Sequence, residues 1–215
     1  MENYKKNLKL LTDSYVYSKE MEHDACGVGL IASTEGKKSR AIVEYGIEAL
    51  KAVWHRGAVD ADGKTGDGAG IHVEIPKDFF FFFIEVTGHD YDNSEICVGM
   101  IFLPKNDYSA QENCKTIVES ELTKNNFSIY GWRQVPVNPK ILGDKALQTM
   151  PEIIQVLFKS NDPNLLNKSL ERKIYETRKK IENKAFNASL NNFYICSMSS
   201  KSIIYKGLYL AEAIS

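Results

Sequence analysis

The apolar positions of the chain fall mainly into short continuous runs, which predict β-strands. Strands are expected over 27–33, 71–75, 97–103, 128–135 and 151–159, and over Phe193–Ser197 and Ser202–Tyr205, the last two as a hairpin. Most of these runs are apolar at successive positions, as in strands that are covered on both faces. The pattern therefore predicts a layered α/β or α+β architecture.

Three segments have the spacing of amphipathic helices. The first is expected from Arg40 to about Trp54, with Ser39 as its N-cap. The second begins at a capping box, Ser109–Glu112, and the third at the N-cap and N1 pair Asp162–Pro163. The apolar stripes are Val43, Ile47, Leu50 and Trp54 in the first helix, and Leu166, Leu170, Ile174 and Ile181 in the third. Charged residues cover the other face of the third helix, which indicates a solvated surface.

Three further segments have no helical or strand period. Residues 1–25 are polar and charged, and we interpret them as a poorly ordered leader. The glycine- and aspartate-rich stretch 57–70 predicts a loop whose backbone approaches another group closely. A phosphate cradle is an alternative for this loop, but the sequence has neither the P-loop pattern nor GxGxxG after a strand. Phe79–Phe83 is interpreted as a buried segment.

The charge balance excludes several classes of partner. The 27 lysines and arginines nearly equal the 28 aspartates and glutamates, giving a net charge of −1, so nothing favours nucleic acid or an anionic membrane. The longest apolar run, Phe79–Ile84, is far too short to span a bilayer, and the N-terminus lacks a signal-peptide core. We therefore expect a cytoplasmic chain with no membrane contact, whose 215 residues form one large or two small domains.

The four cysteines, at positions 26, 97, 114 and 196, predict no metal site. No two of them lie at CxxC spacing, and no histidine stands near them in a ligand pattern except His23 beside Cys26. We expect Cys97, Cys114 and Cys196 to be buried reduced thiols.

Cys26 differs from the others because it directly precedes an apolar run that contains two glycines. If residues 1–25 were removed, Cys26 would carry both a thiol and a free α-amine. An α-amine, whose ordinary pKa is about 7.7–8.0, can take the proton of a thiol whose ordinary pKa is roughly 8.5, directly or through one water. A structural cysteine at the start of a strand is the alternative that spacing alone leaves open.

Three motifs around Cys26 resemble the start of the large subunit of glutamate synthase, in its class II glutamine amidotransferase domain. They are Glu22–Gly29, Trp54–Ala58 and Thr65–Ile71. Four later segments agree in order: Val98–Pro104, Gly131–Pro136, Phe193–Ser197 and Ile204–Gly207. The resemblance covers about residues 20 to 212 and is most specific in its first three motifs.

This resemblance implies a fold, a domain division and a reaction. The fold would be α+β, a layered α/β/β/α sandwich of the N-terminal-nucleophile (Ntn) hydrolases, incomplete at the C-terminus. Residues 1–25 would be a removable leader, and 26–215 the amidotransferase domain. Cys26 would attack the side-chain amide of L-glutamine, form a glutamyl thioester and release ammonia, and Arg56 would lie near it and help to bind substrate. For Arg56, an arginine that satisfies carbonyls at a helix C-terminus is an equal alternative.

The resemblance also implies partners outside this chain. In the full-length enzyme the ammonia would pass to a second site that holds FMN and an iron–sulfur cluster, and the donor of electrons would be a nicotinamide nucleotide or ferredoxin. The chain itself is expected to hold no cofactor and no metal, and to work with the remainder of the large subunit.

One departure from the family weakens the expected activity. Family members use an Asn-Gly pair for the oxyanion hole, and this sequence has no Asn-Gly dipeptide. Loss of one oxyanion donor costs on the order of 10²–10³ in rate. We therefore expect the isolated chain to be weakly active or inactive. A non-catalytic truncated or split-gene fragment, or another class II amidotransferase, remains an alternative.

Overall fold

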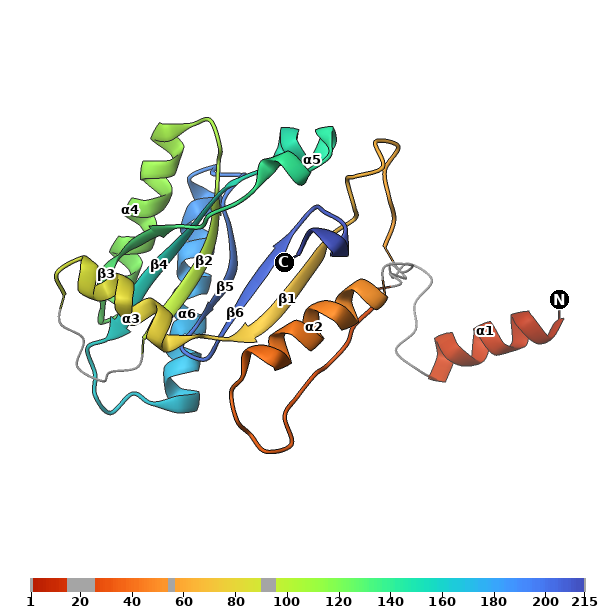
Figure 1. Ribbon diagram of the computed structural model, residues 1–215, viewed down its shortest axis with the longest axis horizontal. Helices are drawn as coiled ribbons and strands as arrows, with labels where there is room; N and C mark the ends of the chain where they lie inside the picture. The colour runs from red at the N-terminus through yellow and green to blue at the C-terminus, as the bar shows by residue number, and fades with distance from the viewer. Residues whose placement is uncertain (1, 15–25, 54–56, 90–95, 215) are drawn as a thin grey trace.

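The computed structural model describes residues 2–14, 26–53, 57–89 and 96–214, and Figure 1 shows their arrangement. The helices are α1 (Glu2–Ser14), α2 (Arg40–Ala52), α3 (Lys77–Val86), α4 (Tyr108–Lys124), α5 (Asp144–Thr149) and α6 (Asn167–Asn187). The strands are β1 (Ala69–Glu74), β2 (Cys97–Leu103), β3 (Phe127–Gln134), β4 (Glu152–Ser160), β5 (Tyr194–Ser199) and β6 (Ser202–Gly207). Two 3₁₀ turns, η2 (Pro139–Ile141) and η3 (Ala211–Ala213), complete the described elements.

The strands form two antiparallel sheets. Four of them pair in the order β3-β4-β2-β5, and the other two, β1 and β6, pair from Ala69↔Gly207 to Glu74↔Ser202. Helices and antiparallel strands in these proportions confirm the α+β class.

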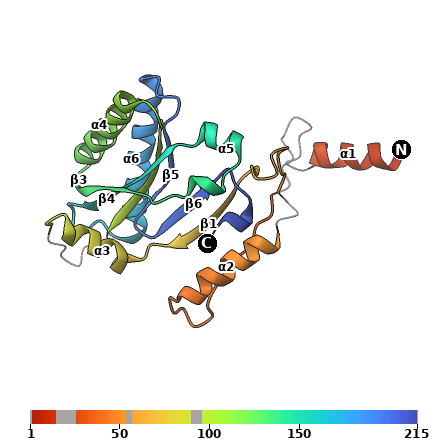
Figure 2. The same cartoon turned by 45° about the horizontal axis from the view of Figure 1, so that its top comes forward.

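The four-stranded sheet is covered on both faces. Helices α4 and α6 pack on one face, and α3 with the β1–β6 pair packs on the other (Figures 1 and 2). The first core includes Cys97, Ile101, Leu103, Val118, Leu122, Phe158, Leu170, Ile174 and Ile181. The second includes Ile75, Phe80, Ile84, Val98, Met100, Leu157 and Ile203. Successive residues of β2 therefore enter different cores, which explains its continuous apolar run. Helix α2 contacts β1 on the side away from the four-stranded sheet, and it has no fully buried residue.

The strand predicted over 27–33 is wrong. Residues 26–33 form neither strand nor helix, and the side chains of Val28 and Leu30 are 90% and 89% exposed. A strand requires a partner for its backbone groups, and no strand of the described structure pairs with this segment. The apolar pattern is present, but the pairing that would bury it is not.

The predicted hairpin of β5 and β6 is also wrong, although both strands exist. Strand β5 pairs with β2 and β6 pairs with β1, so the turn between them carries the chain from one sheet to the other. The hydroxyl of Ser197 accepts a hydrogen bond from the backbone N–H of Ile204 at 3.1 Å, in place of a backbone ladder.

Two helix starts differ from the predictions because local turn chemistry decided them. Helix α4 is capped by Asp107, whose carboxylate accepts from the N–H of Ala110 at 2.9 Å, and not by Ser109. Asp162 closes a separate turn by accepting from the N–H of Asn164, and α6 begins only at Asn167. The predicted α6 stripe is buried except for Leu166, which is 51% exposed.

Two segments predicted without regular structure are helical. Residues 2–14 form α1, so the prediction that they are poorly ordered is wrong, while 15–25 lie outside the described residues. That residues 1–25 are a leader stays a prediction. The phenylalanine run forms α3, in which Phe80 and Ile84 are buried at i and i+4. Phe79 and Phe82 are 43% and 61% exposed, so the run is buried on one side only.

Candidate functional site

Cys26 is the first residue of an irregular segment, residues 26–39, which runs beside α2 and then leads into it (Figure 1). Its side chain is exposed, whereas Cys97, Cys114 and Cys196 are buried, as predicted. Burial raises the pKa of the Cys114 thiol to about 11, and it also raises the pKa of Cys196. Cys26 is thus the cysteine open to an external reactant among the four.

The predicted glycine-rich loop is present and is closed by its own backbone. Val59 forms an isolated bridge with Gly66, and the N–H of Asp60 donates to the carbonyl of Thr65 at 2.9 Å. Gly63 supplies the positive φ, +67°, that reverses the chain between them. The loop is a compact turn that leads directly into β1.

Asp62 organises the tip of this loop. Its carboxylate accepts from the hydroxyl of Thr65 at 2.5 Å and from the backbone N–H groups of Thr65 and Lys64 at 2.7 and 2.9 Å. These hydrogen bonds, the Thr65 hydroxyl first, lower the pKa of Asp62 to about 2. The charged form of this carboxylate is therefore part of the loop structure at neutral pH.

A second contact ties the loop to α5. The ammonium group of Lys145 lies 2.6 Å from a carboxylate oxygen of Asp60 and, by its hydrogen bond, lowers the pKa of that carboxyl. Gly143, at the start of α5, also has no room for a side chain, since a Cβ there would overlap Asp62 and Thr65. Asp60 and Lys145 thus contact each other although they lie 85 positions apart in the sequence. The sequence did not predict this contact, because no local pattern indicates it.

The start of β1 lies against the end of β6. A Cβ on Gly66 would lie 2.7 Å from the carbonyl oxygen of Tyr209, and a Cβ on Gly70 would lie 2.7 Å from the Cβ of Lys206. Two of the motifs noted in the sequence, Thr65–Ile71 and Ile204–Gly207, are therefore neighbours in space. The prediction that this loop brings its backbone close to another group is confirmed.

Arg56 and His23 lie outside the described residues, so the predicted place of Arg56 near Cys26 stays a prediction. Within the described ranges, no three His, Cys, Asp or Glu side chains gather as a metal-binding group. In the same part of the chain, no helix is both long and apolar enough to cross a membrane.

An exposed cysteine ahead of a glycine-rich loop, in an α+β fold of two antiparallel sheets, agrees with the family that the motifs indicated. Residues 26–215 match the class II glutamine amidotransferases, and the chain belongs to this family.

The relatives identify the branch of the family that the chain is similar to. It is 50% identical, over 99% of its length, to the large chain of an NADPH glutamate synthase from Azospirillum brasilense. It is 39% identical, over 90% and 93% of its length, to ferredoxin-dependent glutamate synthases from Arabidopsis thaliana and Pyropia yezoensis. The chain spans only 14%, 12% and 13% of these three proteins.

Proposed function

We propose that residues 26–215 are the glutaminase domain of a glutamate synthase large subunit, with Cys26 as the nucleophile and residues 1–25 as a removable leader. The observation that carries the proposal is the family match, whose residues begin at Cys26. The glutamate synthase relatives favour this branch over other class II amidotransferases. The exposure of Cys26 and the close packing of the 65–70 backbone on β6 support it.

The two antiparallel sheets and their covering helices are compatible with the α/β/β/α sandwich of the Ntn hydrolases, and we assign the domain to that fold on the family match. FMN and the iron–sulfur cluster of a glutamate synthase would lie outside this domain, since three of its cysteines are buried singly and none is at CxxC spacing.

The reaction would use one residue as nucleophile and base. After removal of residues 1–25, the α-amine of Cys26 would accept the thiol proton, and the sulfur would attack the side-chain carbonyl carbon of glutamine. The C–N bond would break, and the same proton would pass to the leaving nitrogen to give ammonia and a glutamyl thioester. Water would then add to the thioester, break the C–S bond and release glutamate with the thiol restored. Arg56 would hold the substrate near this centre.

The free N-terminal cysteine can be tested directly. Intact mass should show a species that lacks Met1–Ala25, and 2-cyanobenzothiazole, which condenses only with a 1,2-aminothiol, should label Cys26 of that species. A purified protein that retains residues 1–25 and does not react would contradict the proposed nucleophile.

The chemistry needs a separate test with a glutamine-analogue electrophile such as 6-diazo-5-oxo-L-norleucine. Peptide mapping should place the adduct on Cys26, and Cys26→Ala should prevent it. Equal labelling of Cys26→Ala would exclude Cys26 as the nucleophile. We expect slow ammonia release from the 215-residue chain, because it contains no Asn-Gly pair to stabilise the oxyanion. Fast release would show that other donors replace that pair.

A further inference from the structure

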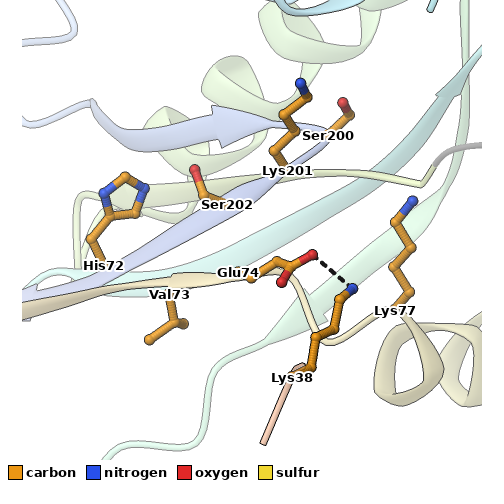
Figure 3. Close-up of a pocket in the computed structure, with 8 residues that line it drawn as sticks. All are labelled: Lys38, His72, Val73, Glu74, Lys77, Ser200, Lys201 and Ser202. Atoms are coloured by element: carbon orange, nitrogen blue, oxygen red, sulfur yellow. Dashed lines mark ion pairs between the residues drawn. The ribbon is translucent and has the colours of Figure 1, made fainter. Parts of the chain in front are cut away.

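A pocket of about 570 Å³ opens at the end of β1 opposite the glycine-rich loop (Figure 3). Three lysines line it, and each comes from a different part of the chain. Lys38 precedes α2, Lys77 is the first residue of α3, and Lys201 lies in the turn between β5 and β6. The fold brings these three lysines to one pocket, and no sequence motif predicts that they lie together.

The pocket carries an excess of positive charge. Glu74 is the one carboxylate among the lining residues, and it pairs with Lys38 at 2.7 Å. Figure 3 shows Lys77 and Lys201 turned away from that pair, and within the described part of the chain neither has an ion-pair partner. The lining therefore holds three ammonium groups and one carboxylate. An anion that enters the pocket would lower their mutual repulsion.

The backbone around Lys201 is fixed in place. The N–H of Ile75 donates to the carbonyl of Lys201 at 3.0 Å, and the N–H of Lys201 donates to the hydroxyl of Ser199 at 2.9 Å. Glu171 lies behind the turn, and its two carboxylate oxygens accept hydrogen bonds from Ser199 and Ser200. This carboxylate is therefore already engaged on the protein side of the turn.

The start of α3 adds to the positive potential. Lys77 is the first residue of a ten-residue helix, and the N-terminal end of a helix favours negative charge. Asp78 follows Lys77 and offsets part of this effect, but it is not a lining residue of the pocket.

We propose that this pocket binds the phosphate group of a small molecule, a function independent of the glutamine chemistry at Cys26. The cations are lysines, which bind phosphate as point charges, whereas planar carboxylates are typically held by the paired donors of arginine. The hydroxyl of Ser202 lines the same pocket and provides a neutral donor. The hollow is open to solvent, and its volume leaves room for more than a single phosphate, so it can take a diphosphate or a phosphate with an attached organic group.

Isothermal titration calorimetry of the full chain with pyrophosphate and with adenosine diphosphate, at fixed ionic strength, tests the proposal. The triple variant Lys38→Gln, Lys77→Gln, Lys201→Gln should weaken binding by about tenfold or more. A matched variant, Lys105→Gln, Lys140→Gln, Lys168→Gln, removes the same charge from exposed sites outside the pocket and should change affinity by less than about twofold. Circular dichroism of both variants establishes that they fold.

The outcomes separate the possibilities. Similar affinity for pyrophosphate and adenosine diphosphate would identify the diphosphate as the recognised group, and tighter binding of the nucleotide would add a site for its organic part. Equal weakening in the two triple variants would mean diffuse attraction and would overturn the proposal. Absence of measurable binding of either compound would do the same. Neither result depends on whether Cys26 is a nucleophile.

Discussion

Glu171 of α6 accepts hydrogen bonds from both the backbone N–H and the hydroxyl of Ser200, each at 2.7 Å. Its other carboxylate oxygen accepts from the hydroxyl of Ser199 at 2.9 Å. One side chain thus holds the turn at which the chain leaves the four-stranded sheet and enters the β1–β6 pair. Strand β6 begins directly after this turn, at Ser202, which pairs with Glu74 of β1.

Glu171→Ala should therefore lower the free energy of unfolding by about 2–3 kcal/mol, since a charge-assisted acceptor of three hydrogen bonds is removed at a half-buried turn. Urea denaturation measures the change. Glu176→Ala, on the same helix, is the matched control. Within the described residues Glu176 pairs with Arg172 alone, at the surface, and its loss should cost less than about 0.5 kcal/mol. Equal effects of the two substitutions would contradict the assigned role of Glu171.

The packing of the glycine-rich loop on the segment after β6 yields a second prediction. Gly66→Ala would place a Cβ 2.7 Å from the carbonyl oxygen of Tyr209, which belongs to the backbone and has little freedom to move. We expect a loss of about 1–3 kcal/mol in the free energy of unfolding. The change should also increase amide hydrogen exchange in the loop and around Tyr209.

Gly29→Ala is the control for this substitution. A Cβ on Gly29 meets nothing within 4 Å, so this variant should unfold within about 0.5 kcal/mol of the parent. Loss of stability in Gly29→Ala comparable to that in Gly66→Ala would mean that the segment after Cys26 is packed in solution, against its exposure here.

The buried strands were predictable because their residues are apolar on both faces. The run at 97–103 was predicted with the bounds that β2 has, and the stripe of Leu170, Ile174 and Ile181 correctly identified the buried face of α6. Both predictions succeeded because the spacing of apolar residues indicates which positions of an element are buried. Helix starts were less predictable, because Asp107 and Ser109 are equally good caps by composition and only the geometry of the loop selects one.

Pairing was not predictable from the same patterns. Strands β5 and β6 are adjacent in sequence and joined by a short polar turn, which favours a hairpin. The structure instead places them in different sheets, and Glu171, 28 positions before Ser199, accepts hydrogen bonds from the turn between them. Long-range contacts in the candidate site were unpredictable for the same reason. The sequence indicated Cys26 and the glycine-rich loop. It did not indicate the residues that contact that loop from elsewhere in the chain, Gly143, Lys145 and Tyr209.

The depressed pKa of Asp62 predicts a pH dependence. The folded-state pKa is about 2, below the ordinary value of 3.8, so the charged carboxylate stabilises the fold above the ordinary value. Asp62→Asn removes this contribution. The difference in free energy of unfolding between parent and variant should be constant above about pH 5 and should shrink as the pH falls from about 4 to 2.

Urea denaturation at several pH values measures this difference. Asp67→Asn is the control, because the side chain of Asp67 makes no hydrogen bond within the part of the chain that the structure describes. A parent–variant difference for Asp62→Asn that does not vary with pH would show that the Thr65 and Lys64 contacts do not depend on the charge.

The phenylalanine run contributes to the fold through an arginine. The guanidinium of Arg133 lies 5.0 and 4.6 Å from the ring centroids of Phe79 and Phe83, and it donates to the side-chain oxygen of Gln155 at 2.8 Å. Gln155 is fully buried, and among the residues that the structure describes its side-chain nitrogen has no hydrogen-bond partner. Arg133 and Gln155 thus form a polar pair among apolar side chains, in which each provides a hydrogen-bond partner for the other.

Arg133→Met should cost about 1–3 kcal/mol, because it removes the cation–π contacts and leaves the buried oxygen of Gln155 without a donor. Adding Gln155→Met should recover part of that loss, since no buried polar group then remains unpaired. A double-mutant cycle by urea denaturation, with Gln155→Met alone as the fourth corner, gives the coupling energy, which should exceed about 0.5 kcal/mol. Strict additivity would mean that the hydrogen bond contributes nothing and that Arg133 acts only through the rings of Phe79 and Phe83.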